Sequence, residues 1–173
     1  MLVKEILNSI RTCLSFEFFP SKTEAGFDKL LQAVSDLMHL KPSYASVTYG
    51  AGGSTRDYTA NLVVLIQKEI GLTVVSHLTC VGSTRDEIMS ILEKDVESDI
   101  ENILALRGDP PKGEAVWKHP DNGFDYAADL VSFLKKNYQH IYIGVGGFPE
   151  VHPITSNMHH ASKFHKGIVD PGS

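Results

Sequence analysis

Short apolar segments alternate with amphipathic helical patterns through most of this chain, and this alternation constrains the fold more than any other feature. Successive apolar segments begin about 30 residues apart, the usual length of a strand–helix–strand unit. Strands that are joined in this way run parallel and are buried by the helices. The sequence therefore predicts an α/β fold with a parallel sheet.

Five apolar segments are predicted strands: residues 14–19, 44–48, 72–78, 102–106 and 141–147. Helical patterns with one apolar face lie between them, and a short amphipathic helix is predicted at 2–10. Two hydroxyl–carboxylate pairs, Ser21 with Glu24 and Thr84 with Glu87, predict capping boxes at the starts of two helices.

Two architectures with parallel strands remain open on this pattern alone: a doubly wound open sheet and a TIM barrel. No dinucleotide-binding glycine motif follows the first predicted strand. That strand instead carries Glu17 near its end, where barrel enzymes place reactive groups. About five strand–helix units can be counted, fewer than the eight of a complete barrel. We expect a single domain over 1–173, whose residues 154–173 lose the pattern and form a divergent tail.

Charge and cysteine content narrow the classes of function. The 173 residues carry a formal net charge of -5, which argues against the clustered basic surface of a nucleic-acid-binding protein. No apolar run approaches the roughly 20 residues of a membrane span. Lys4, Glu5 and Arg11 interrupt the start of the chain, where a secretory signal would be apolar. The two cysteines, Cys13 and Cys80, are far apart, which favours reduced thiols in a cytoplasmic protein.

Polar residues recur at or just beyond the ends of the predicted strands: Glu17, Thr48, His77, Arg107 and Asp109. The carboxyl ends of parallel barrel strands meet on one face, and active sites are built there. This recurrence over successive strands predicts that the five residues share one site.

Glu17 is flanked in sequence by Phe16, Phe18 and Phe19. A carboxyl group among aromatic rings loses solvation and holds its proton more readily, which suits a general acid. A solvated glutamate, or one paired with an arginine, explains the same position equally well on chemical grounds.

The other candidates each have a structural alternative. Thr48 and Tyr49 precede a glycine-rich turn at 50–54, which either admits a flat or anionic ligand close to the backbone or is an ordinary turn. His77 either donates a hydrogen bond to a ligand or is a core histidine whose hydrogen bonds are made within the protein. From this residue alone, the core histidine is favoured. Arg107 and Asp109 either place charges beside a ligand or form an ion pair across their turn.

Four histidines near the end of the chain superficially suggest a metal site: His152, His159, His160 and His165. Their spacing matches no zinc motif, and two of them are adjacent, so on a helix they would point in different directions. No metal site is predicted.

Five motifs occur in a distinctive order: SFEFFP at 15–20, SVTYGAGG at 46–53, HLTC at 77–80, LRGDPP at 106–111 and PEVHP at 149–153. Over about residues 14–153 the chain resembles the methylenetetrahydrofolate reductase family. The resemblance implies a TIM (β/α)8-type barrel that holds FAD non-covalently. In such enzymes NADH or NADPH reduces the flavin, and 5,10-methylenetetrahydrofolate then takes hydride from it to give 5-methyltetrahydrofolate.

The resemblance also implies roles for particular residues. Glu17 falls on the general acid that helps to open the folate's five-membered ring to an iminium ion, and Asp109 falls on a carboxylate beside the flavin and the pterin. Glu17, Thr48 and Asp109 are the implied substrate-binding residues. The implied flavin-binding residues are Thr48, Tyr49, Ala51, His77, Arg107, Gly108, Asp109, Tyr126, Ala127, Phe148 and His152. Phe148 stands where the family frequently has tyrosine, so a hydroxyl contact is lost there.

The family's later strands, which grip folate and nicotinamide, have no counterpart in the 173 residues. We therefore expect little or no turnover from this chain alone, which leaves a non-catalytic flavin-binding or interaction fragment as the alternative function. The sequence does not distinguish NADH from NADPH. It sets no oligomeric state and leaves a homo-oligomer open.

Overall fold

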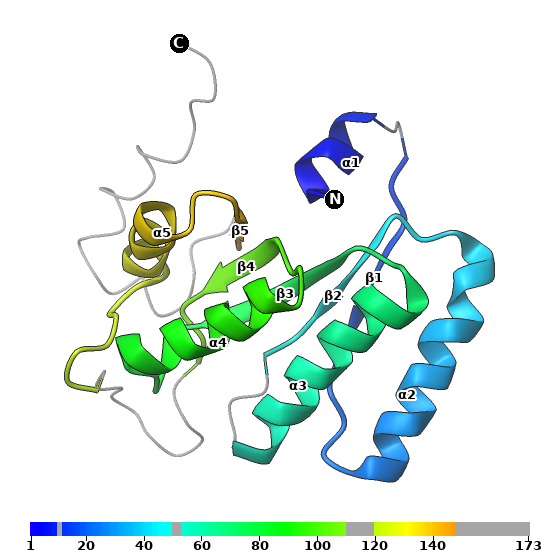
Figure 1. The fold of residues 1–173 in the computed structure, drawn as a ribbon, viewed down its shortest axis with the longest axis horizontal. Helices are drawn as coiled ribbons and strands as arrows, with labels where there is room; N and C mark the ends of the chain where they lie inside the picture. The colour runs from blue at the N-terminus through cyan, green and yellow to red at the C-terminus, as the bar shows by residue number, and fades with distance from the viewer. Residues whose placement is uncertain (10–11, 50–52, 110–119, 148–173) are drawn as a thin grey trace.

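The computed structural model describes residues 1–9, 12–49, 53–109 and 120–147. Within these residues five parallel strands form one sheet (Figure 1). The strands are β1 (Ser15–Phe18), β2 (Tyr44–Val47), β3 (Val74–Thr79), β4 (Asn102–Leu106) and β5 (Tyr142–Val145). The predicted α/β class and all five predicted strands are confirmed, with ends that shift by one or two residues.

The spatial order of the strands decides between the two architectures that the pattern left open. The order is β1-β2-β3-β4-β5, so every crossover adds the next strand on the same side of the last one. A doubly wound sheet reverses direction at a switch point, whereas a barrel never does. The fold is therefore a partial barrel of the TIM type.

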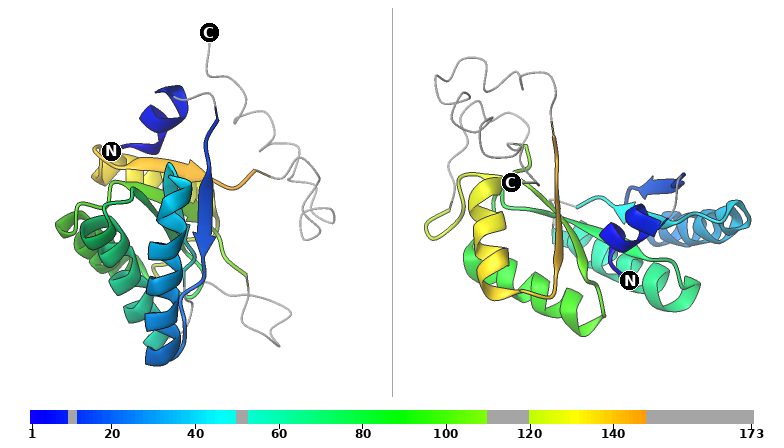
Figure 2. Two further views of the ribbon diagram at one scale, coloured as in Figure 1. Left: turned by 90° about the vertical axis from the view of Figure 1, so that its right-hand side faces the viewer. Right: turned by 90° about the horizontal axis from the view of Figure 1, so that it is seen from above.

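Four helices lie along one face of the sheet, and a fifth stands apart from them (Figures 1 and 2). The four are α2 (Glu24–Leu37), α3 (Gly53–Leu65), α4 (Arg85–Glu97) and α5 (Ala127–Asn137). A 3-10 turn, η1 (Met38–Leu40), extends α2, and a π turn, η2 (Ile66–Ile70), extends α3. The separate helix is α1 (Val3–Ser9), which meets the first residue of β4 through a 2.8 Å hydrogen bond from the Val3 N–H to Asn102 Oδ1.

Alternation along the strands separates an apolar face from a polar one, because successive side chains in a strand point to opposite faces. Phe18, Val47, Val74, Leu78 and Ile103 are buried and pack with the helices in one hydrophobic core. The strand residues that alternate with these, such as Glu17, Ser46 and His77, face the concave side, away from α2–α5. The candidate site lies on this concave side.

One predicted capping box is confirmed and the other is wrong. At the start of α4 the Thr84 N–H donates to Glu87 Oε2 at 2.8 Å, and the Glu87 N–H donates to Thr84 Oγ1 at 3.3 Å. At the start of α2 the cap is Thr23, whose Oγ1 accepts from the Gly26 N–H at 3.2 Å. Ser21 accepts from the Thr23 N–H instead, because the chain turns into the helix two residues later than predicted.

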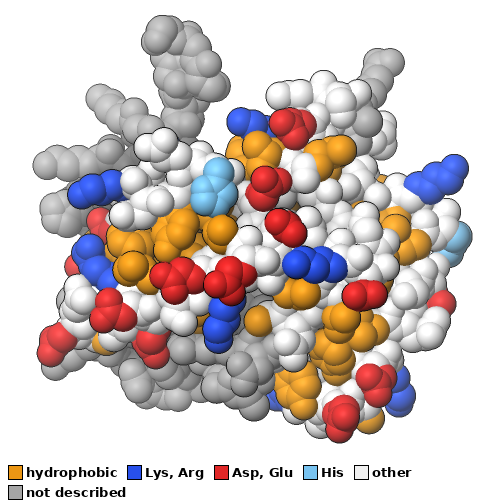
Figure 3. All heavy atoms as spheres, viewed as in Figure 1, with side chains coloured by type: hydrophobic (Ala, Val, Ile, Leu, Met, Phe, Trp, Pro, Cys, Tyr) orange, Lys and Arg blue, Asp and Glu red, His pale blue; other side chains and the backbone are white. Residues whose placement is uncertain are grey.

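The glycine-rich turn predicted at 50–54 is shorter than expected, since Gly53 and Ser54 already belong to α3. Residues 50–52 and the predicted tail at 154–173 lie outside the described residues. The face of the molecule seen in Figure 3 carries acidic and basic side chains interspersed with apolar ones. In the described ranges, every helix is too short or too polar to cross a membrane.

Candidate active site on the concave face

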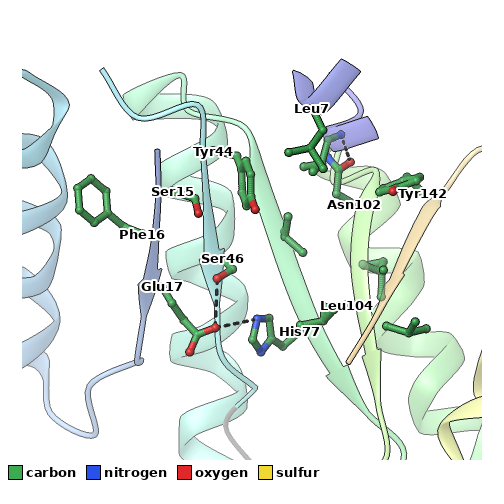
Figure 4. A pocket seen from close by; sticks show the side chains of 15 residues that line it. Leu7, Ser15, Phe16, Glu17, Tyr44, Ser46, His77, Asn102, Leu104 and Tyr142 are labelled. Carbon is green, nitrogen blue, oxygen red and sulfur yellow. Dashed lines mark hydrogen bonds and ion pairs between the residues drawn. The ribbon is translucent and has the colours of Figure 1, made fainter. Parts of the chain in front are cut away.

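A cavity of about 520 Å³ opens on the concave face of the sheet. Residues of all five strands line it, and Val3 and Leu7 of α1 contribute to the lining (Figure 4). The polar lining residues include Ser15, Glu17, Tyr44, Ser46, His77, Asn102 and Tyr142. The cavity thus gathers polar groups from strands that are far apart in sequence.

Three of these side chains meet at one carboxylate oxygen. Glu17 of β1 is paired in register with Ser46 of β2. Ser46 Oγ donates to Glu17 Oε2 at 3.4 Å, and His77 Nε2 of β3 lies 3.5 Å from the same oxygen (Figure 4). Of the predicted site residues, Glu17 and His77 are brought together here.

Of the two alternatives that the sequence left open for Glu17, the structure supports the solvated one, because the neighbouring phenylalanines do not enclose its carboxyl group. Its side chain is 49% exposed. Phe16 points away from it in Figure 4, and Phe18 is buried in the core. Residues that adjoin in a strand lie on opposite faces, so a neighbour in sequence is not a neighbour in space.

His77 is buried, with a side chain that is 7% exposed. Burial lowers the pKa of His77, because removal from water disfavours the imidazolium, and the Glu17 carboxylate opposes this shift. The ring is therefore neutral near pH 7. Within the described part of the chain, His77 Nε2 is buried without a hydrogen bond. His77 also lies inside β3, which runs on to Thr79, and not at the strand end where it was predicted.

Thr48, Tyr49, Arg107, Gly108 and Asp109 lie just beyond the carboxyl ends of β2 and β4, and none of them lines the cavity. Thr48 follows β2, and its N–H donates to the Phe18 carbonyl at 3.0 Å. Tyr49 packs, partly buried, against the core. Arg107 follows β4, and Asp109 is exposed.

Gly108 holds the turn after β4 close to β3. Its φ of 85° lies in the left-handed region that side-chain-bearing residues avoid. A Cβ at this position would overlap Cγ1 of Val81 and lie 3.1 Å from Cβ of Thr79. Position 108 thus requires glycine both because of its positive φ and because a side chain would collide with Val81. The resulting turn sets the positions of the neighbouring residues Arg107 and Asp109.

Tyr126 and Ala127 lie at the start of α5. The Tyr126 N–H donates to Asp129 Oδ2 at 3.1 Å, and its side chain stays 47% exposed. Ala51, Phe148 and His152 lie outside the described residues, as do the other three late histidines. Among the residues that the structure does describe, no cluster of His, Cys, Asp and Glu could hold a metal ion.

Sequence reasoning missed two polar residues of the concave face, Ser46 and Thr79. Ser46 contacts Glu17 directly. The Thr79 Oγ1 is buried and makes no hydrogen bond within the described ranges. Both could have been found by counting in steps of two from Thr48 and His77, since that spacing keeps a side chain on one face.

A sequential parallel sheet with helices on one face and a polar cavity on the other defines a protein of the β/α-barrel class, here as a partial barrel. The chain belongs to the methylenetetrahydrofolate reductase family, whose family model matches residues 2–173.

Named relatives agree with this family assignment. Methylenetetrahydrofolate reductase (NADH) 1 of Arabidopsis thaliana is 38% identical over 152 residues, which cover 87% of this chain and 26% of the plant protein. The 5,10-methylenetetrahydrofolate reductase of Pectobacterium carotovorum is 41% identical over 143 residues, which cover 83% of this chain and 46% of that protein. The Salmonella typhimurium reductase is likewise 41% identical over 140 residues. The chain thus spans between a quarter and a half of the length of these relatives.

Proposed function

We propose that this chain forms the flavin-side part of an enzyme that reduces 5,10-methylenetetrahydrofolate to 5-methyltetrahydrofolate with NADH or NADPH. The observation that carries the proposal is the Glu17 carboxylate, which lies on the concave face of a family-matched barrel beside His77. The plant relative's name specifies NADH for that protein. We leave the donor for this chain as either nucleotide, and we place the protein in the cytoplasm, in keeping with its free cysteines.

In this proposal Glu17 is the general acid. It protonates the folate as the five-membered ring opens to an iminium ion, and its 49% exposure toward the cavity side leaves it accessible to a ligand. Asp109 is exposed at the turn after β4, where a carboxylate would stabilise the positive charge of the iminium. Thr48 is the third proposed substrate contact.

The described residues fit a flavin in one respect that the fold alone does not explain. Thr79 Oγ1 is a buried polar atom without a hydrogen bond in the described part of the chain, and Thr79 belongs to β3 on the concave side. Buried polar groups are normally paired, so this hydroxyl suits a polar group of a ligand. A bound flavin would supply the hydride-transfer chemistry. The residues proposed to hold it are Thr48, Tyr49, Ala51, His77, Arg107, Gly108, Asp109, Tyr126, Ala127, Phe148 and His152.

A second candidate function is a non-catalytic flavin-binding or interaction protein. It is favoured by the half-exposed carboxyl of Glu17, since a general acid is usually more enclosed when its site is complete. The two candidates share the cofactor site and differ in whether folate is reduced.

The cofactor site is tested by the visible spectrum of the purified protein and by titration with FAD. We expect flavin absorption bands, or saturable uptake of added FAD. A colourless protein that takes up no FAD would contradict both candidates.

The acid role is tested by Glu17→Gln, which keeps the shape of the side chain and removes its proton. We expect the variant to lose folate reduction and to retain reduction of the flavin by NAD(P)H. Glu93→Gln, an exposed position on α4, is the control and should leave both half-reactions unchanged. Equal loss of both half-reactions in Glu17→Gln would count against the acid role.

A further inference from the structure

The Glu17 carboxylate uses only one of its two oxygens for contacts with described residues. Ser46 Oγ and His77 Nε2 both approach Oε2, at 3.4 Å and 3.5 Å. Oε1 has no hydrogen-bond partner among the described residues, although the side chain lines the cavity. The two oxygens therefore have different surroundings.

Strand register explains why both contacts fall on the same oxygen. Glu17 and Ser46 are directly paired between β1 and β2, and Ser46 is in turn paired with Val75 of β3. His77 lies two residues beyond Val75 on the same face, so its ring reaches Glu17 past Ser46 (Figure 4). Ser46 thus makes a hydrogen bond to Oε2, and His77 Nε2 approaches the same oxygen without a hydrogen bond, so both groups draw Oε2 toward β2 and β3.

We propose that Ser46 and His77 are positioning residues that hold Oε2 of Glu17 and thereby direct Oε1 toward the ligand in the cavity. The inference rests on the proposed function, in which Glu17 acts on the substrate. It gives Ser46 a role that the motifs did not suggest. It also assigns His77 a contact with the acid in addition to its proposed contact with flavin.

The charge state of His77 fixes the form of the contact. Burial keeps the ring neutral near pH 7, so it carries one N–H. For His77 to donate to Glu17 Oε2, that proton has to lie on Nε2. The other titratable side chains that line the cavity are those of Tyr44 and Tyr142, and Glu17 is the one acidic residue among the lining residues.

The test is long-range ¹H–¹⁵N NMR of the His77 ring, which reports both its tautomer and its titration. In the unmodified chain we expect the Nε2–H tautomer at about pH 7.5. In Glu17→Gln we expect the His77 midpoint to fall by about 0.5 pH unit, because the carboxylate that raises it is gone. Ser46→Ala should shift the His77 midpoint in the same direction. Without the hydrogen bond from Ser46, the Glu17 carboxylate would spend less time beside the His77 ring.

The matched control is Ser15→Ala. Ser15 lines the same cavity from the same strand as Glu17, two residues earlier, and has no described contact with the carboxylate. It should leave the His77 tautomer and midpoint unchanged. If Ser46→Ala does not fold, Ser46→Thr and Ser46→Val replace it, since they differ only in a hydroxyl and a methyl group. Threonine should then match the unmodified chain, and valine should show the shift.

Three results would overturn the proposal: a His77 ring with its proton on Nδ1, a Ser46→Ala midpoint equal to or above that of the unmodified chain, or an equal shift in Ser15→Ala. None of these measurements requires flavin or turnover. The positioning role can therefore fail while FAD still binds, and the proposed function can fail while the positioning contacts stand.

Discussion

The Ser76 side chain of β3 interacts with the carboxyl group of Asp95 of α4, on the face of the sheet opposite His77. Asp95 is only 5% exposed, and its Oδ2 has no hydrogen-bond partner in the described ranges. Burial raises the pKa of Asp95 from 3.8 to about 6, and the interaction with Ser76 opposes that shift only in part. The folded protein therefore favours the protonated form of the Asp95 carboxyl group more than the unfolded chain does.

The linkage has a definite sign. Below the unfolded-state pKa of 3.8 both states bind the proton, and Asp95 costs nothing. As the pH rises from about 4 toward about 6, the unfolded chain releases the proton first, so the free energy of unfolding falls. Above that window the cost is constant. We expect Asp95→Asn to raise the free energy of unfolding by about 1–3 kcal/mol at about pH 7.5 and by little at about pH 4.

Urea unfolding at the two pH values measures this difference. Asp28→Asn is the control, because Asp28 is exposed on α2 and should change stability little at either pH. An Asp95→Asn variant that is less stable at about pH 7.5 would show that the carboxylate is compensated in a way that the described contacts do not reveal.

A comparison of Gly108→Ala with Gly82→Ala should separate the cost of a steric overlap from the cost of an unfavourable backbone conformation. Gly108 and Gly82 both have positive φ, 85° and 68°, but a Cβ has space only at Gly82. We expect Gly82→Ala to cost about 1–2 kcal/mol for its backbone conformation alone. Gly108→Ala should cost about 1–3 kcal/mol more, because its methyl group meets Val81. Thermal or urea unfolding of the two variants tests this order, and equal losses would contradict it.

Asn102 attaches α1 to the sheet. It is 2% exposed, accepts from the Val3 N–H at 2.8 Å and donates to the Met1 carbonyl at 3.1 Å. Asn102→Ala leaves these buried groups unpaired, and we expect it to cost about 1–3 kcal/mol. Hydrogen exchange should show lost protection in α1 before the strands are affected. Asn137→Ala, at an exposed helix end, is the control and should leave α1 protected.

The cap of α4 should contribute more than the cap of α2. Thr84 takes part in a reciprocal box with Glu87, whereas Thr23 satisfies the Gly26 N–H alone. We expect Thr84→Ala to cost about 1 kcal/mol or more, and Thr23→Ala to cost less. Denaturant midpoints of the two variants measure the difference, and a larger loss in Thr23→Ala would refute the expected order.

Local patterns in the sequence were sufficient to predict the elements of the fold. Apolar segments marked the five strands because each strand buries one face against the helices. The box at Thr84 was correct because its partners lie within one helical turn. The box at Ser21 was wrong because two hydroxyls compete for the start of α2, and the path of the preceding chain favours Thr23.

The motifs, read in order, were sufficient for the family. The surroundings of the proposed acid were not predictable in the same way. The three phenylalanines adjacent to Glu17 in sequence indicated an apolar environment, but strand alternation places Phe16 and Phe18 away from it. Its actual neighbours, Ser46 and His77, come from other strands.

The sequence by itself thus determined the strands, most of the helices and the family, since these depend on short-range spacing and on motifs that can be read along the chain. The family resemblance implied a TIM-type barrel, and the strand order confirms it as a partial barrel, whereas the tertiary structure alone decided which groups meet Oε2 of Glu17. These contacts depend on register between strands separated by whole helices. Hydrogen bonding and core packing fix that register across the sheet, and no local pattern encodes it.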